Sequence, residues 1–284
     1  MSESSPTSTP QQTRRRAIVL PREHGAWGLL LVPLLTGLVA GFAPQHRVGE
    51  LLLFTSAAVS VFGLRTPLES LLGIGKVSAH TPYEGRLALI ASGSFALIAG
   101  VCLTALMWRG KYLLLFVIGT AAASAFVMQT TLQRWGRGTR MVSQVIGAVA
   151  LTLTAPAAYH VGTGRLDERA LALWIANSLF AWNQIHFVQM RIQAARATSL
   201  SGKLASGRSF VIAQGLLLIL LLAASHWRAV PPFSIIAFTP ALIRGYSWFF
   251  QQAGPLDVRR LGWSEMKQGV AFGVLLAFTF LYQK

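Results

Sequence analysis

The sequence predicts an all-α fold, a polytopic membrane bundle of about nine transmembrane helices, on three observations. First, 53% of the 284 residues are hydrophobic and only 12% are charged, whereas about one-quarter of an average soluble domain is charged. So few ionised groups do not cover the surface of a soluble domain, which argues against a cytosolic enzyme. Second, apolar runs long enough to cross a bilayer recur along the chain, whose mean hydropathy is +0.52. Third, 25 basic residues outnumber 9 acidic ones and are scattered between the apolar runs, which favours a protein facing anionic lipid over one that binds nucleic acid.

Nine runs meet the requirement of about 20 mostly apolar residues for one membrane crossing. In chain order they are His24–Phe42, Leu51–Leu72, Leu87–Trp108, Tyr112–Leu132, Val142–Val161, Ala170–Met190, Ser209–Trp227, Pro232–Phe250 and Ser264–Tyr282. Pro156 and Pro240 are expected to kink the fifth and eighth spans. The pairs Gly37/Gly41 and Gly269/Gly273 permit close helix packing in the first and ninth.

The basic residues orient these spans. Nine spans place the N-terminus and every second loop on one side, which carries Arg14, Arg15, Arg16, Arg22, Arg65, Lys76, Arg86, Arg134, Arg137, Arg140, Arg191, Arg196, Lys203, Arg208, Arg259 and Arg260. The other side carries fewer: Arg47, Arg109, Lys111, Arg165, Arg169, Arg228 and Lys284. Cytoplasmic loops are the lysine- and arginine-rich ones. We therefore expect a multi-pass protein of the bacterial inner (cytoplasmic) membrane with a cytoplasmic N-terminus and an external C-terminus.

The chain divides into a tail and one domain. Residues 1–20 predict a disordered, basic N-terminal tail, because the first 13 are rich in Ser, Thr, Pro and Gln. Residues 21–284 predict a single transmembrane helical domain. Cys102 is the only cysteine, so the chain has no internal disulfide and no cysteine-based metal site.

Polar residues gather where the first span begins, at Arg22, Glu23 and His24. One interpretation is a well-formed helix start, since Pro21 suits a first helical turn and an acid complements the helix N-terminus. The other interpretation is a ligand site, because the small residues that follow let another group approach closely. Both alternatives stay open.

A second polar group stands at the end of the second span, where Pro67 is expected to end or kink the helix. Arg65 and Glu69 are four residues apart, so they can pair along one helix face. Their alternative role is to contact a ligand.

The sixth span is the most unusual. At about 100° per residue, Asn183, His186, Gln189 and Gln193 form one polar stripe, and Arg191 lies off it. Lipid does not solvate such a stripe, so it faces other helices or a wet cavity. Hydrogen bonding between helices is one explanation, and a ligand-contacting surface is the other. On the second reading Asn183, Gln189 and Arg191 bind the ligand and His186 is a catalytic proton donor or acceptor.

Other features narrow the chemistry. Arg244 is a base inside the eighth span and needs a partner or an anion. No acidic residue occurs between Asp167–Glu168 and Asp257, so the sixth span has no carboxylate pair for Mg²⁺ and no metal site is predicted. The sequence leaves the cofactor and the oligomeric state open.

The stretch Leu20–Gly28, continuing through Pro33, resembles the signature start of the YwiC-like family of bacterial integral membrane proteins, whose activity is unassigned. Residues 65–68 and 186–191 are compatible with that family. A more distant resemblance is to the UbiA prenyltransferase superfamily, because Arg22, Gly25 and Pro33 stand in similar places. The superfamily implies nine helices, a cytoplasmic N-terminus and a site at the cytoplasmic ends of helices two and six. Its two aspartate-rich magnesium motifs are absent from this chain.

Three functional hypotheses follow. The first is a diverged UbiA-like protein, a non-standard prenyl or lipid transferase if it is an enzyme. It would bind an isoprenoid or another anionic lipid-like ligand in a cytoplasm-facing cavity between spans one, two and six, with Arg22, Glu23, His24, Arg65 and Glu69 as contacts besides those of span six. The second is a carrier or permease for a small metabolite. The third is a non-catalytic membrane scaffold. Membrane lipids are the expected partners, and nucleic acid is not.

Overall fold

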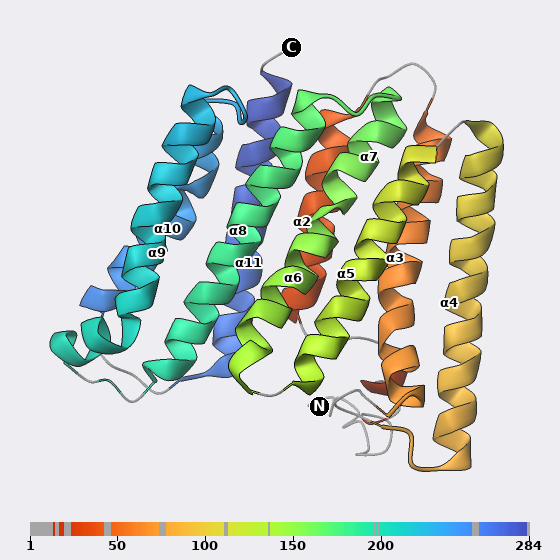
Figure 1. The fold of residues 1–284 in the computed structure, drawn as a ribbon, viewed down its shortest axis with the longest axis horizontal. Coiled ribbons are helices and arrows are strands. Elements are labelled where there is room, and N and C mark those ends of the chain that lie inside the picture. Colours follow the sequence, from red (N-terminus) through yellow and green to blue (C-terminus); the bar gives the residue numbers. More distant parts are fainter. Residues whose placement is uncertain are drawn as a thin grey trace, which may run out of the picture. The chain divides into compact units, whose positions relative to one another are not determined.

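A computed structural model of the chain describes residues 14, 17–19, 24–42, 47–73, 78–110, 113–135, 137–195, 197, 199–251 and 256–282 (Figure 1). Within these ranges the fold is all-α and contains no strand, which confirms the predicted fold class. The α-helices are α2 (His24–Ala40), α3 (Val48–Leu71), α4 (Pro82–Arg109), α5 (Leu113–Arg134), α6 (Arg140–Thr152), α7 (Thr154–Thr163), α8 (Glu168–Gln193), α9 (Leu200–His226), α10 (Ser234–Phe250) and α11 (Val258–Leu281), and a 3₁₀ turn η1 (Arg137–Thr139) precedes α6.

Each predicted span coincides with a helix, except that the fifth is divided. Helices α6 and α7 follow one another end to end and are separated at Leu153 (Figure 1). Pro156 explains the position, because a proline lacks the N–H that would bond four residues back and its ring clashes with that carbonyl, here of Thr152. The expected distortion is therefore a break one turn before the proline. Pro33, Pro67 and Pro240 instead lie inside continuous helices.

The helices form two compact units. Unit 1 comprises residues 1–23 and 52–111, with α4 and nearly all of α3, and unit 2 comprises residues 24–51 and 112–284, with α2 and α5 to α11. This division shows which helices are most densely packed together and does not test whether residues 21–284 form one domain. A single transmembrane domain over residues 21–284 therefore stays a prediction. The predicted disorder of residues 1–20 falls mostly outside the described residues, which here include only Arg14 and 17–19.

Helix α8 lies in the middle of unit 2, where it packs against α2, α6, α7, α9 and α10. The core beside it is aromatic: the rings of Phe180 and Phe272 stack at 3.9 Å, and Phe238 meets Phe272 edge-on at 5.1 Å. Rigid aromatic packing of this kind holds α8, α10 and α11 together.

Close packing at glycines, predicted for the first and ninth spans, is confirmed. A side chain on Gly37 would overlap the backbone of Ala155 in α7, and one on Gly41 would approach the Cα of Tyr159 to 2.8 Å. A Cβ on Gly273 of α11 would lie 3.0 Å from Val32 of α2. Glycine therefore lets α2 approach both α7 and α11.

Five segments of the described chain are long and apolar enough to cross a membrane: Val48–Leu71, Pro82–Arg109, Leu113–Gln133, Met141–Thr163 and Leu200–His226. Helix α2 is apolar but shorter. Large apolar side chains such as Leu89, Leu97 and Trp108 of α4 are exposed, as expected for helices whose surroundings are lipid. The chain is thus a polytopic helical membrane protein, and a total of nine crossings stays a prediction.

Candidate functional site

In unit 1, Arg65 and Glu69 pair as their spacing predicts. The Nε of Arg65 donates to a carboxylate oxygen of Glu69 at 2.7 Å, and the side chains are 28% and 22% exposed. Of the two effects expected of Pro67, an end or a kink of the helix, the end does not occur, because α3 continues to Leu71. The interval between residues 65 and 69 stays helical, and this is what brings the two side chains together.

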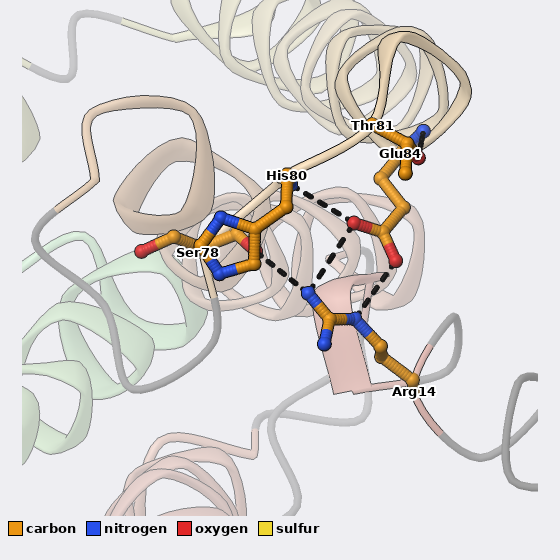
Figure 2. A network of polar contacts seen from close by, with 5 residues as sticks. All are labelled: Arg14, Ser78, His80, Thr81 and Glu84. Carbon is orange, nitrogen blue, oxygen red and sulfur yellow. Dashed lines mark hydrogen bonds and ion pairs between the residues drawn. The ribbon is translucent and has the colours of Figure 1, made fainter.

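Unit 1 also holds a polar network at the start of α4 (Figure 2). The carboxylate of Glu84 accepts from the Nε of Arg14 at 2.8 Å and from the backbone N–H of His80 at 2.9 Å. The hydroxyl of Thr81 accepts from the backbone N–H of Glu84 at 3.2 Å. Thr81 and Glu84 thus cap the start of α4 in the manner of a capping box. Arg14 forms an ion pair with the Glu84 carboxylate.

The contacts predicted at the start of the first span lie mostly outside the described residues. Arg22 and Glu23 lie outside the described residues, and only the backbone of His24 is described, as the first residue of α2. Ligand contact by these residues, and by Arg65 and Glu69, stays a prediction.

The polar stripe on α8 makes hydrogen bonds to neighbouring helices. Gln214 of α9 donates to Asn183 at 2.5 Å, and Gln189 donates to Gln144 of α6 at 2.7 Å. His186 lies against Phe210, with 5.6 Å between ring centroids. Gln193 is exposed at the helix end. The bonds of Asn183 and Gln189 are those expected of the packing alternative.

Helices α8 and α10 end, and α9 and α11 begin, at the same end of unit 2 (Figure 1). A buried group of charges involves residues in the halves of these helices toward that end. Arg244 of α10 donates through Nη1 to Glu265 of α11, and the side chains are only 12% and 7% exposed. Gln184 of α8 donates to the backbone carbonyl of Glu265 at 3.0 Å. The partner that Arg244 was expected to need is therefore Glu265.

Two further cations, Arg191 and Lys203, lie beside this group in contact with aromatic rings. The Arg244 guanidinium carbon lies 4.1 Å from the centroid of the Phe187 ring, and that of Arg191 lies 6.0 Å from it. Arg191 is also 5.5 Å, and the Lys203 ammonium 5.1 Å, from the Trp248 ring. Arginine and lysine are attracted to the faces of aromatic rings. We call Arg191, Lys203, Arg244 and Glu265, with these two rings, the arginine cluster.

Lys203 is 4% exposed and donates to the backbone carbonyls of Trp248 and Gln251, where α10 ends. A cation at this position complements the negative end of the helix dipole and the carbonyls that lack a helical partner. Lys203 therefore has a structural function as well as contributing charge.

Arg244 retains unused hydrogen-bond donors. Its Nε and Nη2 are buried and have no hydrogen-bond partner among the described residues. The second carboxylate oxygen of Glu265 is likewise unpartnered within these ranges. A buried polar group without a partner costs about 1–3 kcal/mol, and more when it is charged. One edge of the Arg244 guanidinium is therefore buried without a hydrogen-bond acceptor among the described residues.

Sequence reasoning missed Gln184, Phe187 and Glu265, and it placed Lys203 in a loop. Glu265 carried a signal, because it is an acid at the second position of the predicted ninth span. An acid and a base in adjacent spans are natural partners. In the part of the chain that the structure describes, no group of three or more His, Cys, Asp or Glu is placed to hold a metal ion.

The fold and the buried charges define a class, a polytopic membrane protein with a charged cluster inside its helix bundle. The family model described as YwiC-like protein matches residues 20–159, so the predicted resemblance to the YwiC-like family is confirmed over that region. Searches of curated proteins and of solved structures find no match. The resemblance to the UbiA superfamily stays a prediction.

Proposed function

We propose that this membrane protein binds the head group of an anionic, lipid-like ligand, such as an isoprenoid, at the arginine cluster of unit 2. The observation that carries the proposal is the buried Nε and Nη2 of Arg244, which lack a partner among the described residues. An anionic oxygen is the acceptor that a guanidinium prefers, and the fixed fork of arginine suits carboxylate and phosphate.

The surroundings of the cluster favour an amphiphile over a small free anion. In a membrane an ionisable group is expensive unless it is paired, and such residues commonly mark a ligand path. The rings of the cluster, Phe187 and Trp248, belong to a buried apolar core that also contains Met190, Phe210 and Phe249, and an apolar tail would gain free energy by leaving water beside such groups. The ligand would then contact α8, as the sequence predicts, but on the flank facing α10 and α11 and not on the polar stripe.

Native mass spectrometry of the detergent-purified protein, with extraction and identification of retained lipid, tests the proposal. Wild type should retain an anionic lipid, and Arg191→Gln should lose it while keeping the Arg244–Glu265 pair intact. Arg208→Gln is the matched control, because Arg208 is an exposed arginine on α9. Equal lipid retention by all three proteins would contradict the proposal and favour a scaffold.

We further propose that the protein lies in the bacterial inner membrane with its N-terminus in the cytoplasm and its C-terminus outside. The excess of lysine and arginine on the predicted cytoplasmic loops supports this orientation. The arginine cluster would then lie toward the cytoplasmic face. His186 would be the candidate proton donor or acceptor if the ligand is also a substrate.

A further inference from the structure

We propose that the head group is a phosphomonoester dianion and that the arginine cluster recognises it without a divalent cation. This inference rests on the proposed function and adds the class of ligand. Two features of the cluster carry it, the charge that the cluster leaves unbalanced and the geometry of its unused donors.

The charge balance favours a dianion. Arg191, Lys203 and Arg244 supply three positive charges against the single negative charge of Glu265, and Phe187 and Trp248 hold the cations in one group. The formal charges of the cluster therefore sum to +2, and the carbonyls at the end of α10 offset part of this charge at Lys203. Charges interact strongly where water is excluded. A dianion neutralises the cluster, whereas a carboxylate or a phosphodiester leaves one cation unbalanced.

The donors match three terminal oxygens. Arg244 uses Nη1 for Glu265, which leaves the Nε and Nη2 edge, one of the two edges that bind two oxygens at once. Arg191 makes cation–π contacts with Phe187 and Trp248 and no ion pair within the described residues. A phosphomonoester has three terminal oxygens, two for the Arg244 edge and one for Arg191. A phosphodiester has only two.

The acids of the cluster do not suit a bridging metal. Mg²⁺ and Ca²⁺ bind through several oxygen ligands, mainly carboxylates. Glu265 is the single carboxylate of the cluster, and it is engaged by Arg244. The arginines therefore do directly what a metal ion would otherwise do, namely neutralise the phosphate.

The test compares two probes that differ by one charge. Full-length protein in maltoside micelles containing EDTA is titrated with dodecyl phosphate or with dodecyl methyl phosphate, and the bound fraction is measured by native mass spectrometry. At about pH 8 the monoester is a dianion, since its second pKa is near 6, and the diester is a monoanion. We expect wild type and Arg208→Gln to prefer the monoester by about tenfold or more, and Arg191→Gln to lower that preference to about threefold or less.

The outcomes separate this inference from the proposed function. Equal affinity for the two probes, with both lost in Arg191→Gln, would overturn the dianion assignment and leave the anionic ligand in place. Absence of Arg191-dependent binding of either probe would overturn both. A monoester preference that appears only when Mg²⁺ replaces EDTA would overturn metal-free recognition.

Discussion

Arg244 and Glu265 stabilise one another at a depth where either charge alone would be costly. Their side chains are 12% and 7% exposed, so little water compensates either group. Breaking such a pair costs about 3–5 kcal/mol because a lone charge is left behind, whereas replacing both partners is much cheaper. The attraction within the pair therefore adds little net stability, whereas the loss of one partner leaves the other as an unpaired buried charge.

The first prediction is a coupling between these two residues. Arg244→Gln and Glu265→Gln should each lower the free energy of unfolding by about 3 kcal/mol. The effect of the double variant should fall short of the sum of the two single effects by about 2 kcal/mol or more. Denaturant titration in micelles measures all four proteins. Additive effects would show that the two charges are not paired in the folded protein.

The second prediction concerns the pair at the surface of unit 1. Arg65 and Glu69 lie on adjacent turns of one helix, and their side chains are partly exposed. Such pairs contribute about 0.5 kcal/mol or less to the free energy of unfolding. Glu69→Gln should therefore change the free energy of unfolding by no more than that. A loss comparable to that of Glu265→Gln would assign the pair a role beyond helix surface pairing.

The partner of Arg244 is an example of a contact that the sequence alone does not determine. An arginine inside an apolar run predicts that a partner exists, and Arg244 has one. That the partner is Glu265 depends on α10 packing beside α11, and hydropathy does not predict which helices are neighbours. The stripe of Asn183 and Gln189 was visible from helical spacing, but its hydrogen-bonded partners Gln214 and Gln144 come from other helices.

Glycine and proline determine how the helices meet. Gly37 lies against the backbone of Ala155 in α7, and backbone atoms do not move aside as a flexible side chain does. A proline three residues after Leu153 accounts for the division between α6 and α7. Glycine has no side chain and proline has no backbone N–H, so the sequence alone predicts both the close glycine packing and the proline distortion.

The third prediction compares two glycines of the same helix. Gly37→Ala should lower the free energy of unfolding by about 1–3 kcal/mol, because the added methyl group forces α2 away from α7. A side chain on Gly28 would meet nothing within 4 Å, so Gly28→Ala should leave stability unchanged or raise it by up to about 1 kcal/mol. Equal effects at the two positions would argue against the close approach of α2 and α7.

For the whole molecule, hydropathy predicted the helices well because each apolar run must form its own backbone hydrogen bonds in lipid. It predicted the break at Leu153 only as a kink, and it did not predict the grouping of helices into two compact units. That grouping depends on which helix faces are complementary, as at Gly63 of α3, where a side chain would come within 2.9 Å of Phe95 in α4.

The fourth prediction fixes the orientation in the membrane. In a Cys102→Ala background, single cysteines replace Gly138 and Arg165, two exposed positions in successive connections of unit 2. A membrane-impermeant maleimide applied to intact spheroplasts should label Arg165→Cys and spare Gly138→Cys until the cells are lysed. The reverse pattern would invert the orientation, and labelling of both without lysis would refute alternation across the membrane.

Photo-crosslinking with an alkyl phosphate that carries a diazirine next to its head group, followed by peptide mapping, would locate the bound anion in the fold. Binding at the arginine cluster predicts adducts in the segments around residues 184–191 of α8, 244–248 of α10 and 261–268 of α11, and excess unlabelled alkyl phosphate should suppress them. Adducts confined to other helices, or adducts in these segments that excess ligand does not suppress, would contradict anion binding at this cluster.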